Sequence, residues 1–234
     1  MSDPLRVALV VEGPTDHIVI DAAMRAMLGN RRFILTPLQP EGSLAFGPLG
    51  GGWGGVYRWC VQQARDGGGR LSLNRMLDRF DLLIVHVDAD VADDTYAAAN
   101  ITPRPADLPL PCARPCPPAA ESTNPLRAVV LSWCGEPAPP ERILFCVPSK
   151  SMEAWVVASL FPNDAAVMSR TVPFECYPTP ESRLGQQPKN VRFAKRQPDY
   201  RARSLHLRTE WPRIAAPGGL EEANRFRLEF LAAV

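Results

Sequence analysis

The stretch LRVALVVEGPTD at residues 5–16 decides the fold. Its first seven residues are almost continuously apolar and rich in β-branched side chains, which is typical of a strand that is covered on both faces. Gly13 and Pro14 then turn the chain, and the pattern predicts a helix that begins at Pro14 or Thr15 and ends at Gly29. A buried strand that leads directly into a helix is typical of α/β proteins.

Further apolar runs continue this alternation of strand and helix. We expect strands at 33–38, 82–87 and 142–147. We expect helices at 56–65, 71–79, 124–134 and 220–234. Strands that alternate with helices predict a mostly parallel sheet with helices on both faces, and ligands of such sheets bind at the carboxyl ends of the strands.

Two segments between these elements have unusual compositions. Residues 47–55 contain six glycines, which predicts a tight or mobile loop, and they lack the Gly-Lys-Ser/Thr ending of a P-loop. Residues 100–118 are rich in proline and show no periodicity, which predicts a loop or an insertion with little regular structure.

Carboxylates follow two of the predicted strands. Glu12 and Asp16 come directly after the first strand, and Asp88 and Asp90 end the run LLIVHVDAD at 82–90. Side chains two residues apart share one face of an extended chain, so Asp88 and Asp90 could reach one cation or bridge two. An unpaired buried carboxylate costs several kcal/mol, and a divalent cation is the simplest compensation. The pattern therefore predicts a Mg²⁺ or Mn²⁺ site with oxygen ligands, which is suited to phosphate chemistry.

Three motifs together resemble a known family. EGPTD at 12–16, DAD at 88–90 and PSKSMEAW at 148–155 resemble motifs of the Toprim domain, which is found in topoisomerases, bacterial primases and OLD-type nucleases. The third motif is similar to that of the stand-alone prokaryotic Toprim-like proteins of the nuclease branch. The resemblance implies a Rossmann-like, Toprim catalytic core at 1–160, with a proline-rich insertion at about 95–140.

The resemblance also implies roles for individual residues. Glu12 takes a general acid/base or metal-ligand role, and Asp88 and Asp90 hold magnesium. Asp16 matches the acidic position that closes the first motif, and Glu153 matches an additional metal ligand of the nuclease branch, in which two metals activate water and stabilise the leaving oxygen. From the residues alone, Asp16 can instead favour the positive end of its own helix.

Other polar residues of these motifs are interpreted from their positions. Lys150, one of only three lysines, stands where a preorganised cation can neutralise a scissile phosphate. His86 lies on a predicted strand, and we interpret it as a core histidine. Asp93 and Asp94 follow the aspartate pair, and we interpret them as capping or solvated residues.

The C-terminal part at 161–234 is expected to be a basic, helical extension that packs on the core. Between 181 and 213 there are nine Lys or Arg and three Asp or Glu, with Phe193, Tyr200 and Trp211 among them. Such a stretch can track a phosphate backbone and stack on bases, and a surface helix that pairs with acidic residues of the same chain is an equal alternative. The residues that we expect to bind nucleic acid are Lys189, Arg192, Lys195, Arg196 and Arg201.

Composition sets outer limits on location and partners. The 234 residues include 26 basic and 25 acidic ones, and a net charge of +1 neither indicates nor excludes a nucleic acid partner. The six cysteines, with no charged segment followed by an apolar one at the start, predict a reduced, cytoplasmic protein. Cys112 and Cys116 could supply two zinc ligands, but no Cys or His pair follows at finger-like spacing. No apolar run approaches the roughly 18–20 residues that span a bilayer, so we expect no membrane contact.

The motifs and the resemblance favour a Mg²⁺- or Mn²⁺-dependent nuclease that hydrolyses phosphodiester bonds of DNA or RNA. The resemblance also implies prokaryotic defence against phage or mobile elements, often beside an ATPase partner, and the chain itself has no ATPase motif. The alternatives are a non-cleaving Toprim-fold binding or effector subunit, and a nucleotidyl or phosphoryl transferase of a small molecule. The oligomeric state stays open, a homo-oligomer included.

Overall fold

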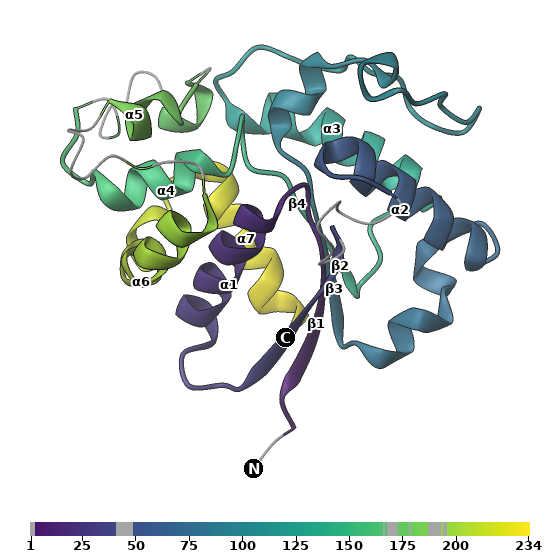
Figure 1. The fold of residues 1–234 in the computed structure, drawn as a ribbon, viewed down its shortest axis with the longest axis horizontal. Coiled ribbons are helices and arrows are strands. Elements are labelled where there is room, and N and C mark those ends of the chain that lie inside the picture. The colour runs from purple at the N-terminus through teal and green to yellow at the C-terminus, as the bar shows by residue number, and fades with distance from the viewer. Residues whose placement is uncertain are drawn as a thin grey trace.

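The protein is an α/β protein built on a parallel sheet (Figure 1). The computed structural model describes residues 3–40, 49–165, 167, 173–177, 179–186, 193 and 196–234. The four strands are β1 (Leu5–Val10), β2 (Phe33–Gln39), β3 (Leu82–His86) and β4 (Ile143–Cys146). They pair in the order β2-β1-β3-β4, and every pair is parallel. The predicted parallel sheet is confirmed, and its arrangement is Rossmann-like.

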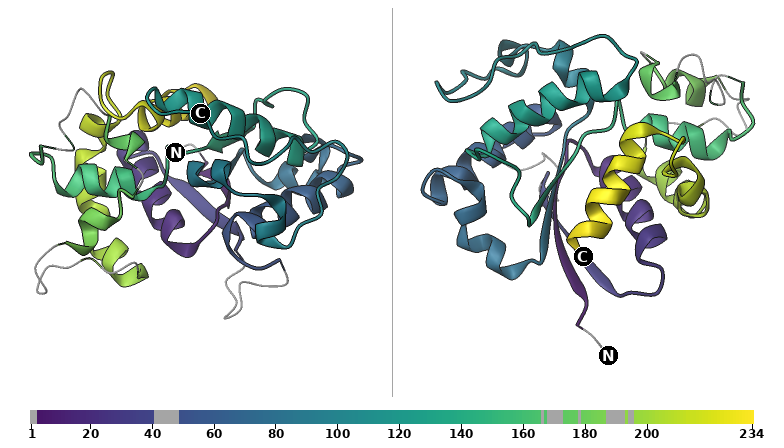
Figure 2. Two further views of the ribbon diagram at one scale, coloured as in Figure 1. Left: turned by 90° about the horizontal axis from the view of Figure 1, so that it is seen from above. Right: turned by 180° about the vertical axis from the view of Figure 1, so that it is seen from behind.

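Alternate side chains of the strands supply two apolar cores, one on each face of the sheet. Val7 and Leu9 of β1 lie in one core, whereas Ala8 and Val10 lie in the other, because successive side chains of a strand point to opposite faces. Helices cover both faces, and Figures 1 and 2 show the two sets on opposite sides of the strands. The first set is α1 (Pro14–Leu28), α4 (Glu153–Leu160), α6 (Gln197–Ile214) and α7 (Glu221–Ala233). The second set is α2 (Gly52–Asp66) and α3 (Ala119–Trp133).

The glycine-rich segment differs from the predicted loop, because α2 begins within it at Gly52. A Cβ on Gly55 would lie 2.4 Å from the carbonyl oxygen of Gly50, so only glycine fits this close approach of two backbones. The amide of Gly52 donates to the carbonyl oxygen of Glu12 at 2.9 Å. The start of α2 is therefore held against the end of β1. Residues 47 and 48 lie outside the described residues.

The start of α3 also differs from the prediction. The helix was expected to begin at Asn124, but it begins at Ala119 and contains Pro125. Side chains of α7 hold this extra turn, since the carboxylates of Glu221 and Glu222 accept from the Ala119 amide at 3.0 Å and the Thr123 hydroxyl at 2.6 Å. A tertiary contact thus extends the helix past the local start signal.

One further segment, at 71–79, departs from its predicted structure, and another, at 100–118, follows it. The predicted helix at 71–79 consists of two 3₁₀ turns, Leu71–Leu73 and Arg75–Arg79, which are separated by Asn74. The side chain of Asn74 accepts from the Met76 amide at 2.8 Å, and this local bond competes with a continuous helix. Residues 100–118 contain neither helix nor strand. The remaining short helices are Ala89–Asp93, Tyr96–Ala99, Phe174–Cys176 and α5 (Ser182–Gly185).

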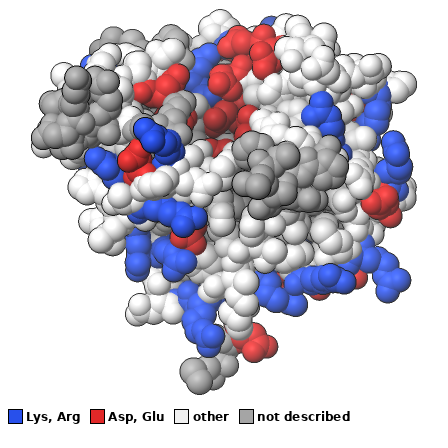
Figure 3. Space-filling view, in the orientation of Figure 1, with Lys and Arg blue, Asp and Glu red and all other residues white. Residues whose placement is uncertain are grey.

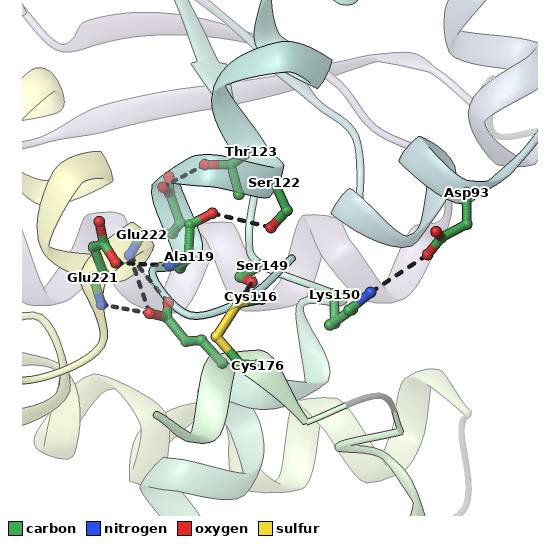
Figure 4. Close-up of a disulfide and its surroundings, with 11 residues drawn as sticks. Asp93, Cys116, Ala119, Ser122, Thr123, Ser149, Lys150, Cys176, Glu221 and Glu222 are labelled. Carbon is green, nitrogen blue, oxygen red and sulfur yellow. Dashed lines mark hydrogen bonds and ion pairs between the residues drawn. A yellow bond between two sulfur atoms is a disulfide. The ribbon is translucent and has the colours of Figure 1, made fainter. Parts of the chain in front are cut away.

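The cysteines correct one expectation. Cys116 and Cys176 form a disulfide between the segment before α3 and the 3₁₀ turn Phe174–Cys176, so not every thiol is reduced (Figure 4). Cys60 and Cys146 are buried free thiols, as expected of small core residues. No helix in the described ranges is long and apolar enough to cross a membrane.

Candidate functional site

The segments that follow β1, β3 and β4 are tied together at the carboxyl edge of the sheet. The carboxylate of Glu12, after β1, accepts from the amide of Asp88, after β3, at 2.8 Å. The amides of Ala89 and Asp90 donate to the carbonyl oxygens of Pro148 and Lys150, after β4, each at 3.0 Å. The three sequence motifs therefore meet in space, as the parallel topology requires.

Asp88 and Asp90 do not lie on one face of a strand, as the sequence predicted. The strand ends at His86, and Asp88 begins the 3₁₀ turn Ala89–Asp93, which carries Asp90. One carboxylate oxygen of Asp88 accepts from the Met152 amide at 2.9 Å and lies 3.1 Å from His86 Nε2. These bonds fix the Asp88 carboxylate, whereas Asp90 is exposed at the rim of the site.

His86 is a site residue that the sequence interpretation placed in the core. Its ring is fully buried, as expected, but Nδ1 lies 3.7 Å from Asp16 Oδ2 and Nε2 lies 3.1 Å from Asp88 Oδ1. Burial lowers the pKa of His86, and the charges of Asp16, Glu153 and Asp90 offset this only in part, so the neutral ring is favoured. The signal in the sequence was its position two residues before Asp88.

Glu153 joins the cluster from the first turn of α4. It is buried, and its Oε1 accepts from the hydroxyl of Tyr200 at 2.6 Å. Tyr200 lies on α6, and its burial beside Glu153 raises the pKa of the phenol, which keeps the hydroxyl protonated and able to donate. The sequence offered Tyr200 only as an aromatic of the basic stretch.

Burial and mutual repulsion disfavour the charged forms of these carboxylates. Burial, and next the charge of Asp88, raise the pKa of Glu12 well above its usual value, although the Asp88 amide partly offsets them. Burial raises the pKa of Asp16 to about 7, against the lowering effect of His86. Partial desolvation by neighbouring groups, and next the charge of Asp94, raise the pKa of Asp90 to about 6, although this residue is exposed at the rim. A cation at this edge would relieve all three effects.

The carboxylate oxygens of the described cluster suit a hard divalent cation in their chemistry, but the structure does not place them as ligands of one ion. Within the described ranges, no group of three His, Cys, Asp or Glu residues is arranged so that it could hold a metal ion. The donors come from three separate segments, which carry Glu12, Asp88 and Glu153. Small shifts of these segments would have to bring the oxygens onto one ion.

Lys150 lies beside the cluster in an unusual backbone conformation. Its φ of 59° is in the left-handed region, which non-glycine residues adopt rarely and often at functional sites. Its ammonium lies 3.4 Å from a carboxylate oxygen of Asp93, as Figure 4 shows. Asp93 is thus an ion-pair partner of Lys150, and the pair lies at the rim of the site.

The basic residues expected to bind nucleic acid are only partly described. Lys189, Arg192 and Lys195 lie outside the described residues. Arg196 and Arg201 are exposed at the start of α6. On the face shown in Figure 3, acidic side chains gather at the top, near the carboxyl edge of the sheet, and basic ones lie to the left, to the right and below.

The expected stacking aromatics are not available to bases. Phe193, Tyr200 and Trp211 are buried in the core between α6, α1 and α4, at 5%, 4% and 1% exposure. The prediction that they interleave with a bound strand is wrong, because their apolar rings pack inward.

The structure thus brings Glu12, Asp16, Asp88 and Glu153 together with His86 and Tyr200, and it leaves Asp90 and Lys150 at the rim. Comparison of the chain with protein-family models, with curated proteins and with solved structures finds no match.

Proposed function

We propose that the chain is a Mg²⁺- or Mn²⁺-dependent phosphodiester hydrolase of the Toprim type, acting on DNA or RNA. The observation that supports this most is the meeting of Glu12, Asp16, Asp88 and Glu153 at the carboxyl edge of a parallel sheet. Buried carboxylates with raised pKa values are candidate functional groups, and a divalent cation is the partner that suits them.

Glu12, Asp88 and Glu153 would hold the cation, with Asp16 behind them and Asp90 at the rim. When bound, a divalent cation activates water and stabilises the negative charge that develops on a phosphoryl group. Bonds from His86 and the Met152 amide hold the Asp88 carboxylate in place. Preorganisation of this kind lowers the cost of orienting a charged group during the reaction.

Where Glu12 does not hold the cation, its carboxylate would instead serve as general acid or base. Burial and the charge of Asp88 raise its pKa, and a carboxylate with a raised pKa is a stronger base when it is ionised. Lys150 supplies the nearest described ammonium, and a bound phosphate would compete with Asp93 for it. Lys150 would then stabilise the phosphate through direct charge.

The wider setting follows the Toprim resemblance. It supports a role in defence against phage or mobile elements, beside a separate ATPase. The glycine-rich residues 47–55 lack a P-loop sequence, so this segment does not supply ATP hydrolysis.

The first experiment separates catalysis from folding. Labelled plasmid, single-stranded DNA and RNA are incubated with Mg²⁺ or Mn²⁺ and with wild type or Asp88→Asn. Asparagine keeps the oxygen that accepts from Met152 and removes the charge, so the fold should persist while cleavage falls by about 100-fold or more. Asp66→Asn, at the exposed end of α2, is the matched control and should cut like wild type.

Two results would count against the hydrolase. Full activity of Asp88→Asn would show that the carboxylate cluster takes no part in catalysis. A folded wild type that binds nucleic acid and cuts none of the three substrates with either metal would favour a non-cleaving binding subunit.

A further inference from the structure

An open hollow of about 830 Å³ lies between the first turns of α1 and α6. These two helices pack closely along the first core, so both walls of the hollow are supported. Its lining consists of Pro14, Thr15, Arg196, Gln197, Pro198 and Arg201. The two arginines are the charged members of this lining, and no carboxylate belongs to it.

Each wall of the hollow has a residue that is adjacent in sequence to a member of the carboxylate cluster or to its hydrogen-bond donor. On α1, Thr15 precedes Asp16, whose carboxylate lies 3.7 Å from His86. On α6, Tyr200 precedes Arg201, and its hydroxyl donates to Glu153. The two helices that form the hollow thus also carry Asp16 and Tyr200 of the candidate site.

The arginines of the hollow differ in their partners from those arginines of the fold that pair with carboxylates, such as Arg25 and Arg213. Arg25 and Arg213 form ion pairs with carboxylates of their own helices, each at 2.7 Å. In the part of the chain that the structure describes, neither Arg196 nor Arg201 lies within ion-pair distance of a carboxylate. Arg201 bonds only to the neutral side chain of Gln197, at 3.2 Å. Both guanidinium groups can therefore pair with an external anion.

We propose that this hollow binds a phosphate group of the substrate, next to the phosphodiester that lies at the carboxylates. The inference rests on the proposed function and adds a binding subsite to it. Guanidinium groups match phosphate oxygens in pairs of hydrogen bonds, and the hydroxyl of Thr15, which donates to Asp16 at 3.5 Å, would have to exchange that long bond to donate one more. Carboxylates alone repel a phosphodiester, and a fixed pair of cations beside them offsets that repulsion.

A phosphate group that binds in the hollow can belong to either of two kinds of ligand. One is the backbone of a nucleic acid strand, whose successive phosphates would occupy the cluster and the hollow together. The other is a single phosphate on a small molecule. A test with an oligonucleotide and with inorganic phosphate distinguishes them.

Binding is measured with Ca²⁺, so that no cleavage is needed for the readout. A fluorescent 12-nucleotide single strand is titrated with wild type, Arg196→Gln, Arg201→Gln and Arg208→Gln. Arg208 is exposed on α6 outside the hollow and is the matched control. We expect each hollow variant to bind about 10-fold more weakly and to lower the slope of log K against log salt by roughly 0.7. Arg208→Gln should stay within about 2-fold of wild type.

The outcomes assign the source and can overturn the subsite. Inorganic phosphate that displaces the strand at millimolar concentration from wild type indicates a site for single phosphate groups. Displacement only by unlabelled strand indicates a backbone site. Equal losses in all three variants would show diffuse charge on α6 and no subsite, and so would three variants that bind like wild type.

The same variants separate this inference from the hydrolase. If wild type cleaves its substrate, and Arg196→Gln and Arg201→Gln cleave it equally well, the phosphate site in the hollow is contradicted and the hydrolase proposal is supported. If binding depends on both arginines but the protein cuts nothing, the phosphate site in the hollow is supported and the hydrolase proposal is contradicted. Thermal unfolding of each variant checks that the fold is retained.

Discussion

At the scale of single residues, the site is a set of acids held by specific donors. Asp88 is held by His86 and the Met152 amide, Glu12 by the Asp88 amide, and Glu153 by Tyr200. Each donor fixes an oxygen that would otherwise rotate, which matters because charged groups act best when they need no reorientation. The residues that donate these hydrogen bonds are therefore as important to the geometry of the site as the acids are.

Tyr200 is a positioning residue whose loss can be measured directly. Tyr200→Phe removes the hydroxyl that donates to Glu153 and keeps the buried ring. We expect kcat to fall by about 10-fold, the Mn²⁺ concentration for half-maximal rate to rise, and stability to fall by roughly 1–3 kcal/mol. Activity is titrated with Mn²⁺ and unfolding is followed with urea.

The control for this prediction is Tyr177→Phe. Tyr177 is partly buried and its ring packs at a tilt against Phe174, and no bond of its hydroxyl is seen among the described residues. Equal metal titrations for Tyr200→Phe and wild type would show that the hydroxyl serves the fold alone.

At the scale of elements, the start of α7 depends on a buried carboxylate from another part of the chain. Glu175 accepts from the amides of Glu221 and Glu222, the first two residues of α7. Carboxylates favour helix starts because the amides there point outward without helical partners. Glu222 in turn accepts from Thr123, in the first turns of α3, and from Arg127, further along the same helix, so one polar network joins α3 to the start of α7.

This network predicts a pH-dependent stability. Burial, and next Glu222, raise the pKa of Glu175 from 4.5 to about 8, although the two amide bonds lower it in part. The folded state therefore holds a proton that the unfolded chain releases above its own pKa. Stability contributed by this group is present below pH 4.5 and is lost as the pH rises through 8, at roughly 1.4 kcal/mol for each pH unit between these values.

Glu175→Gln isolates this effect from the other buried acids. Glutamine can still accept the helix amides, and it has no proton to lose. We expect the free energy of unfolding of the variant to decline less between pH 5 and 8 than that of wild type, in urea titrations at several pH values. Glu141→Gln, at an exposed position, should follow wild type. Parallel curves for Glu175→Gln and wild type would rule out a proton at Glu175.

At the scale of the whole molecule, the disulfide joins segments that pack on opposite faces of the sheet. Cys116 lies between Cys112, which packs on the second core, and α3. Cys176 follows Phe174 of the first core. The two cysteines are 60 positions apart in the sequence, and β4 and α4 lie between them. The Cys116 sulfur lies 3.9 Å from the hydroxyl of Ser149, next to Lys150. The link therefore spans the carboxyl edge close to the candidate site (Figure 4).

Removal of this link should destabilise the whole fold. Closing a loop of this length restricts the unfolded chain by about 4 kcal/mol in the chain-entropy view, so Cys116→Ser should lower the unfolding temperature by roughly 10 °C. A reducing agent should produce the same decrease in wild type and no further decrease in the variant. Cys112→Ser, which removes a free thiol, is the control. Wild type that unfolds at the same temperature with and without reducing agent would contradict the prediction.

The sequence by itself determined the sheet and the position of its acids. Apolar runs and the strand–helix alternation are local patterns, so β1, β3 and β4 could be placed from their own residues. Parallel topology then required Glu12 and Asp88 to meet, because strands that share one direction end at one edge. The first turn of α1 followed in the same way from Gly13 and Pro14.

Only the tertiary structure decided the bonds that turn these acids into a site. Tyr200 reaches Glu153 across 47 residues, and Cys116 reaches Cys176 across 60. The 3₁₀ turn at Asp88 is set by bonds to the segment after β4, and the early start of α3 is set by α7. No local pattern encodes such contacts, since they depend on which helices pack side by side once the cores on both faces of the sheet are buried.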